Sequence, residues 1–95
     1  MDKTVVMKAT DNVATCLADM RAGEEAVVKV DANTRSVTLK GDIPFGHKVA
    51  LMDIAVGSKI TKYAETIGIA SEPIAAGEHV HVHNVESVRA RGDKS

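Results

Sequence analysis

Asp53-Ile54-Ala55-Val56-Gly57 is one of three stretches of similar shape that indicate how this chain folds. The other two are Asp19-Met20-Arg21-Ala22-Gly23 and Pro73-Ile74-Ala75-Ala76-Gly77. Each places an apolar residue three positions before a glycine, and a strand-like stretch follows. We expect each to form one helical turn, closed by a glycine with positive φ, that leads into a strand. Because the copies are irregularly spaced, they predict a compact β fold with one-turn helices, not a solenoid.

The remaining segments predict one short helix, several strands and a frayed end. Apolar residues recur at helical spacing from Val13 to Met20, with Asp11 or Asn12 as the N-cap and Gly23 at the end. The polar residues 89–95 are expected to form a flexible tail. β-Branched and alternating stretches predict strands over residues 4–8, 26–30, 36–39, 59–63 and 79–85, with turns over 32–35 and 40–42.

The composition indicates one small domain without a nucleic-acid or membrane role. The 95 residues allow a single domain, expected to be ordered over about residues 3–88. Aromatic residues make up only 2% and the net charge is −1, so neither base stacking nor a basic face is available for nucleic acid. No apolar run approaches the ~20 residues of a membrane helix, and the N-terminus lacks a secretory signal. The expected compartment is the cytoplasm.

The four histidines lie in two short stretches. His47 stands alone, whereas His79, His81 and His83 alternate with valines. In a strand, these three imidazoles share one face. Imidazole binds divalent metals and moves protons near neutral pH, so the pattern points to a metal or substrate site. The alternative is a solvated edge strand, because same-face residues lie ~6.5–7 Å apart and converge on one metal only if the strand bends.

A loop and two lysines are candidates for binding an anion. In Gly46-His47-Lys48, the glycine allows backbone N–H groups to approach an anion while Lys48 holds a carboxylate. Lys62 is a second candidate, and a plain surface charge is the alternative for both lysines. Tyr63 is expected to be the large ring of the core. Cys16 is expected to be a buried, unreactive thiol, because nothing near it resembles an activating base.

An ordered series of motifs over residues 3–86 resembles the N-terminal region of altronate dehydratases (altronate hydrolases) and the related galactarate dehydratases. The resemblance implies a SAF domain, which is a β-clip of short strands and one-turn helices, over the whole of residues 1–95. The motifs are Asp11-Asn12-Val13-Ala14, Leu17-Ala18-Asp19, Gly46-His47-Lys48-Val49-Ala50-Leu51, Asp53-Ile54-Ala55 with Gly57, Ile60 with Lys62-Tyr63, Ile67-Gly68, and Ile74-Ala75-Ala76-Gly77-Glu78-His79-Val80-His81-Val82-His83-Asn84.

The resemblance also implies a reaction and a partner. Enzymes of this family are hydro-lyases that remove water from a sugar acid to give a 2-keto-3-deoxy acid. In them the domain is joined to a larger catalytic region or is a separate small subunit, so we expect a large catalytic partner here, with a homo-oligomer also possible. The proton removed lies α to a carboxylate, so a divalent metal (Fe²⁺ or Mn²⁺), a base and an acid are expected.

The residues that match the family's segments are expected to form the site. By resemblance, His47, His81 and His83 are expected to be catalytic residues and metal ligands. The substrate-binding residues are expected to be Lys48 and Lys62 for the carboxylate, Gly46 in the preceding loop, and Asn84, which would orient a hydroxyl or a histidine.

Other functions fit the same resemblance. A related small subunit belongs to sulfolactate sulfo-lyase, which eliminates sulfite in place of water from a similar 2-hydroxy acid. The chain could also be a sugar-acid-binding module without catalysis, which would bind its ligand alone. A third alternative is a structural SAF domain that helps its enzyme to oligomerise, whose histidines would be replaceable without loss of rate.

Overall fold

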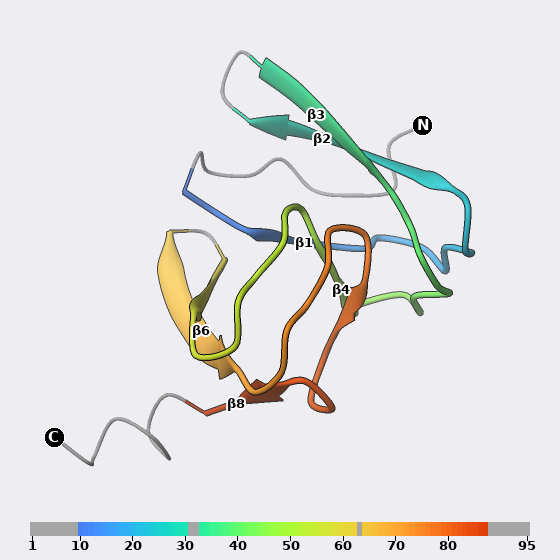
Figure 1. Ribbon diagram of the computed structural model, residues 1–95. Coiled ribbons are helices and arrows are strands. Elements are labelled where there is room, and N and C mark those ends of the chain that lie inside the picture. Colours follow the sequence, from blue (N-terminus) through green and yellow to red (C-terminus); the bar gives the residue numbers. More distant parts are fainter. Residues whose placement is uncertain (1–9, 31–32, 63, 88–95) are drawn as a thin grey trace, which may run out of the picture.

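The computed structural model describes residues 10–30, 33–62 and 64–87, which form eight short strands and no helix (Figure 1). The predicted mainly β fold is confirmed. The strand expected over residues 4–8, the ring of Tyr63 and the tail 89–95 lie outside the described residues. Over the described ranges, no helix is long and apolar enough to cross a membrane. The strands are β1 (Val13–Thr15), β2 (Glu25–Val30), β3 (Asn33–Thr38), β4 (Lys48–Ala50), β5 (Lys59–Lys62), β6 (Glu65–Ala70), β7 (His79–Val80) and β8 (Val85–Glu86).

The strands form three small antiparallel sheets. One has the order β1-β4-β7 and another the order β5-β6-β8, while β2 and β3 form a hairpin. Figure 1 shows the hairpin at the top, β1 and β4 in the middle, β6 at the left and β8 at the bottom. Because β4 is the central strand of its sheet, it brings β7, from the end of the described chain, close to β1.

Two aliphatic cores lie on opposite faces of β1 and β4. Val13 and Ala50 belong to one core, whereas Ala14 and Val49 belong to the other, because successive strand residues point to opposite faces. Cys16 is buried, and burial raises the pKa of its thiol to about 11, so it is unreactive at neutral pH as expected. The other buried members are Met20, Ala26, Val28, Leu39, Ile43 and Leu51 in one core and Ile54, Ile60, Ala70, Ile74 and Val80 in the other.

The apolar residue–x–x–Gly pattern forms β-turns and not the expected one-turn helices. In each turn, the N–H after the glycine donates to the carbonyl three residues earlier, which is the closing bond of a four-residue turn. The glycine takes the positive φ that a type II turn requires at its third position. A fourth copy, Ile43-Pro44-Phe45-Gly46, was not recognised in the sequence. The closing bonds are Glu24 to Arg21, His47 to Pro44, Ser58 to Ala55 and Glu78 to Ala75, each 3.0 Å.

The four turns associate in two pairs. Met20 bridges Ile43, and Ile54 bridges Ile74, just before each turn begins. The aspartate before a bridging residue accepts a hydrogen bond from the partner turn, which holds the two turns of a pair together. Pro73 stands in the fourth such position and has no side-chain acceptor. The bonds run to Asp19 from Phe45 N–H (2.8 Å), to Asp42 from Ala22 N–H (2.9 Å) and to Asp53 from Ala76 N–H (2.9 Å).

The helix predicted from Val13 to Met20 is wrong. Its first residues form β1, which pairs with β4, and bends follow. Asp11 and Asn12 do not cap a helix. Their Oδ1 atoms accept hydrogen bonds from the N–H groups of Ala64 (2.7 Å) and Thr61 (2.8 Å), at the end of the β5–β6 hairpin. These bonds to distant segments outweigh the weak local preference that helical spacing indicates.

Candidate functional site

The histidines gather around the start of β4 and around the short strand β7. His47 immediately precedes β4, and the antiparallel register sets Lys48 opposite Val80. One step further along this register, His47 faces His81. Their rings stack with centroids 3.7 Å apart and planes 12° apart, and the ring of His79 lies 4.9 Å from that of His47. Strand pairing therefore brings together two stretches that are far apart in the sequence.

Three of these imidazoles could hold a divalent metal. The ring nitrogens of His47, His79 and His81 all lie within 4.8 Å of one another, and all three residues are half-buried. Nδ1 of His47 lies 2.7 Å from Nε2 of His79, so the N–H of one ring donates a hydrogen bond to the nitrogen of the other. Tetrahedral ligation at ~2.0–2.1 Å sets ligand nitrogens ~3.3 Å apart. A ring nitrogen binds metal in the plane of its ring, and the three rings are stacked within 20° of parallel, so they would have to turn out of the stack to bind one metal together.

The structure differs from the predicted triad at one position. The prediction named His47, His81 and His83, whereas the grouped residues include His79 and leave His83 at the exposed edge, its ring 4.9 Å from that of His79 and tilted by 41°. The cause is the chain path. The strand expected over residues 79–85 ends at Val80, residues 81–84 turn, and β8 begins afterwards. The alternating pattern that singled out His81 applied equally to His79.

Asn84 is buried inside this turn and contacts backbone. Its Oδ1 accepts a hydrogen bond from the N–H of His81 (3.0 Å), and its Nδ2 donates to the carbonyl of His79 (2.8 Å). The side-chain amide therefore engages the backbone of the segment that carries the histidines.

Gly46 has a different role from the predicted one. Its φ of 86° completes the turn before β4. Its N–H donates to the carbonyl of Cys16 (2.9 Å), and the N–H of His47 donates to the carbonyl of Pro44 (3.0 Å). Both N–H groups are thus engaged within the protein, and the loop positions His47 without forming the expected anion cradle.

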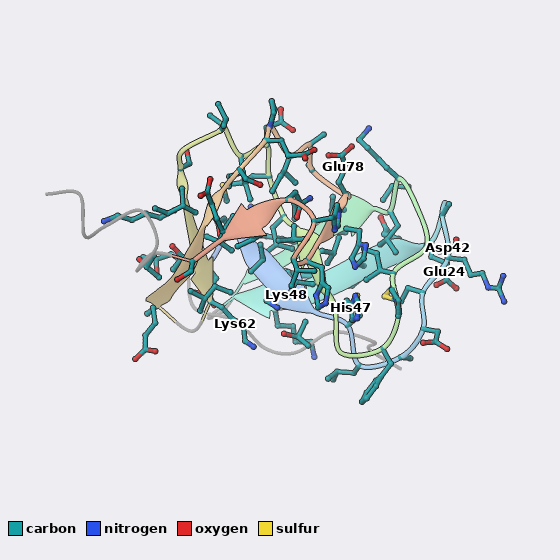
Figure 2. All side chains as sticks on the ribbon, turned by 90° about the horizontal axis from the view of Figure 1, so that it is seen from below. Glu24, Asp42, His47, Lys48, Lys62 and Glu78 are labelled. Atoms are coloured by element: carbon teal, nitrogen blue, oxygen red, sulfur yellow. The ribbon has the colours of Figure 1, made fainter. Side chains whose placement is uncertain are left out.

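Lys48 lies near the imidazoles, and Lys62 lies near Lys48. Lys48 is in β4 and Lys62 ends β5, and Figure 2 shows both on the side of the molecule that carries His47. Burial, and then the positive charge of Lys62, lowers the pKa of Lys48. A negatively charged ligand would relieve this repulsion.

The surroundings also disfavour protonated histidines. Burial, and then the charges of neighbouring histidines and Lys48, lowers the pKa of His79. Desolvation, and then the charges of His47, Lys48 and His83, lowers the pKa of His81. Neutral imidazoles are the form that binds metal or accepts a proton.

Two hollows adjoin the cluster. One, of about 270 Å³, has Lys48 and His81 among otherwise mainly aliphatic walls, and it includes Val82, which is 80% exposed. The other, of about 320 Å³, is polar and includes His79 and His83. The remaining walls of the first are Ile60, Ile67, Val80, Val85, Glu86 and Ser87, and those of the second are Lys40, Gly41, Glu72, Glu78 and Asn84.

Comparison with known proteins identifies the family. Residues 2–88 match the family model of the altronate/galactarate dehydratase SAF domain. The chain is 46% identical over 83 residues to an altronate dehydratase of Escherichia coli and 39% identical over 87 residues to one of Bacillus subtilis, which is 87% and 92% of this chain. It spans only 16% and 17% of the length of those relatives.

A shorter relative matches almost end to end. The chain is 38% identical over 88 residues to the (2R)-sulfolactate sulfo-lyase subunit alpha of Chromohalobacter salexigens, covering 90% of this chain and 94% of the relative. Dehydratases and sulfo-lyases are both lyases, and the shorter relative is one subunit of its enzyme. The chain belongs to the altronate/galactarate dehydratase SAF-domain family, a family of lyase components, as its ordered motifs predicted.

Proposed function

We propose that this chain is the small SAF component of a metal-dependent hydro-lyase that dehydrates an altronate-like sugar acid to a 2-keto-3-deoxy acid, together with a larger catalytic polypeptide. The observation that carries the proposal is the group formed by His47, His79 and His81 next to Lys48. Membership of a lyase family supplies the reaction class.

The chemistry of the reaction suits these side chains. A divalent metal on the three imidazoles would supply positive charge that makes the proton α to the substrate carboxylate easier to remove. Burial and the charge of Lys62 disfavour the charged form of Lys48. Binding the substrate carboxylate would offset this cost. The lowered pKa of His81 keeps its ring neutral near pH 7, so it could accept a proton if it is not a metal ligand.

The need for a larger polypeptide follows from exposure. The three imidazoles are only half-buried, and charge stabilisation is weak where water reaches the reacting groups. Val82 at 80% and Phe45 at 66% exposure, each two residues or fewer from a cluster histidine, are apolar side chains that a second polypeptide could cover. In the altronate dehydratases, this domain is about one sixth of a longer chain.

A second candidate is the small subunit of a (2R)-sulfolactate sulfo-lyase. It is favoured by one observation, the 94% coverage of that relative. The same cation group would serve either substrate, because both are 2-hydroxy acids. Only the leaving group differs, water in one case and sulfite in the other.

The test is an assay of this chain alone and mixed with its candidate large polypeptide, with Fe²⁺ or Mn²⁺, on altronate, galactarate and (2R)-sulfolactate. Activity in the mixture only, on a sugar acid, is the expected result, and release of sulfite would select the second candidate. If this chain alone binds a sugar acid and the mixture shows no turnover, both lyase proposals are wrong and the chain is a binding module. If the variants His47→Ala and His81→Ala are fully active in the mixture, the chain has only a structural role.

A further inference from the structure

The turn between β7 and β8 is organised around one buried polar side chain. Asn84 is 5% exposed, and apart from its two side-chain bonds its N–H donates to the carbonyl of His81 (3.1 Å). Its own carbonyl accepts a hydrogen bond from Ser71 (2.9 Å), which anchors the turn to the segment after β6. Asn84 is therefore fixed from both sides, and its amide is presented rigidly to the backbone of the histidines.

That amide spans the two residues whose imidazoles must converge. Its donor binds the carbonyl of His79, and its acceptor binds the N–H of His81, one on each side of Val80. In a continuing strand, alternate side chains stand ~6.5–7 Å apart. Here the chain leaves the strand direction after Val80, and the ring centroids of His79 and His81 lie 5.7 Å apart with their ligand nitrogens within 4.8 Å.

We infer that Asn84 is a positioning residue, whose amide bends the chain so that the imidazoles of His79 and His81 converge with His47 on one divalent metal. The inference rests on the proposed function only in taking a metal as the ligand. The convergence of the rings is a property of the chain itself. Residues that orient metal ligands typically change metal affinity about 10–100-fold when they are replaced.

The chain contains a matched control for this residue. Asn12 also uses both ends of its amide on backbone, with Oδ1 accepting from Thr61 (2.8 Å) and Nδ2 donating to Lys59 (2.9 Å). Both of these bonds are to β5, away from the histidine turn. Asn12→Ala and Asn84→Ala therefore remove the same two kinds of bond, and only the second removes them next to the imidazoles.

The experiment measures Zn²⁺ affinity of the full chain by competition with a chromophoric chelator, and Co²⁺ absorption as a probe of ligand geometry. Asn84→Ala is expected to weaken Zn²⁺ binding about tenfold or more and to change the Co²⁺ bands, and Asn12→Ala to change affinity less than about threefold. Nuclear Overhauser effects between the His47 and His81 rings in the metal-free chain give a second readout. They should be lost in Asn84→Ala and kept in Asn12→Ala.

The outcomes separate this inference from the proposed function. Equal affinity and intact ring contacts in both variants would overturn the positioning role. If the unmodified chain binds no Zn²⁺ or Co²⁺ yet only Asn84→Ala loses the ring contacts, the metal part of the proposed function fails and the positioning role stands. If Asn84→Ala does not fold, Asn84→Asp replaces it. This variant keeps the acceptor for His81 but cannot donate to His79, and unchanged ring contacts there would equally overturn the inference.

Discussion

The rings of His47 and His81 stack at 3.7 Å although one residue precedes β4 and the other follows β7. The register that pairs Lys48 with Val80 sets the two histidines opposite one another, and Asn84 holds the N–H of His81 where this pairing ends. A site assembled by strand register takes its residues from both of the paired strands. It is therefore testable by replacing single members of the group and comparing them with a neighbour outside it.

Replacing His79 should distinguish the observed triad from the triad predicted by alternation. His79→Ala is expected to weaken Zn²⁺ binding about 100-fold, because the ligand set falls from three imidazoles to two. His83→Ala should change affinity no more than about threefold, since His83 lies outside the group whose nitrogens lie within 4.8 Å. Isothermal titration of both variants checks this. A larger loss in His83→Ala would restore the triad of His47, His81 and His83.

Acidification should destabilise the metal-free fold through the same histidines. The pKa of His79 and of His81 is lowered from 6.5 in the folded chain, so the folded state binds fewer protons than the unfolded state below that pH. Stability therefore rises with pH up to about 6.5 and is lost as the pH falls from there toward the lowered values.

Urea unfolding of the unmodified chain and of His81→Gln, at several pH values from about 7.5 to 5, measures this effect. Carboxylates contribute equally to both chains, so the difference in slope belongs to His81. The slope should be smaller in the variant. Parallel pH profiles would show that the charges of Lys48 and the other histidines do not act on His81 in the folded chain.

The sequence singled out the histidines but did not predict how they are arranged. Alternation of His79, His81 and His83 predicted that these imidazoles share one face of a strand. The strand ends at Val80, although the ring of His79 does lie near those of His81 (5.7 Å) and His83 (4.9 Å). Alternation indicates only which side chains would share a face. It could not indicate the turn after Val80, because that turn depends on Asn84 bonding to backbone, and such bonds compete with strand pairing in a way that alternation does not encode.

The turns and the first segment show the same limit in the fold. The positive φ of Gly23, Gly57 and Gly77 was predictable, because glycine adopts it without steric cost. The sequence did not predict whether the glycine closes a helical turn or a β-turn. The apolar residue before each turn pairs with a distant segment, and this pairing is not visible in the local sequence. Likewise, Val13 becomes part of a strand only because β4 lies beside it, and β4 is distant in the sequence.

Two glycines with the same backbone conformation should differ in their tolerance of a methyl group. Gly57 and Gly77 have φ values of 87° and 90°, so alanine at either is strained by roughly 1–2 kcal/mol. A Cβ at Gly57 has no neighbour within 4 Å, whereas one at Gly77 would meet the carbonyl of Thr38.

Gly77→Ala should therefore lose about 1–3 kcal/mol more of the free energy of unfolding than Gly57→Ala. Urea unfolding of the two variants measures the difference directly. Equal losses would mean that the segment around Thr38 moves aside, and that the hairpin of β2 and β3 is not tightly held against this turn.

Lys48 should act on the substrate and not on the metal. In the mixture with the large polypeptide, Lys48→Met is expected to lower kcat/KM about 10–100-fold, since a charge-assisted hydrogen bond to the carboxylate is lost. Zn²⁺ affinity should not fall, because removing this positive charge raises the pKa of His81 only toward its usual range. Lys48→Arg, which keeps the charge, is the control. A drop in metal affinity in Lys48→Met with unchanged kcat/KM would exclude carboxylate binding.

The exposed valine beside the cluster offers a test of the larger polypeptide. Val82 is 80% exposed and lines the aliphatic hollow that also includes Lys48 and His81. A partner that covers the imidazoles should bury it, and burying a valine side chain is worth ~1.5–3 kcal/mol, which corresponds to a tenfold or greater change in a dissociation constant.

Val82→Ser is therefore expected to weaken association with the large polypeptide at least about tenfold, as measured by analytical ultracentrifugation or surface binding. Val56→Ser is the matched control, because Val56 is 58% exposed on a turn that does not line this hollow. Zn²⁺ affinity should be the same in both variants, since neither residue is a ligand. If both weaken association equally, or neither does, the partner covers a different face, and the half-buried imidazoles would need another source of shielding from water.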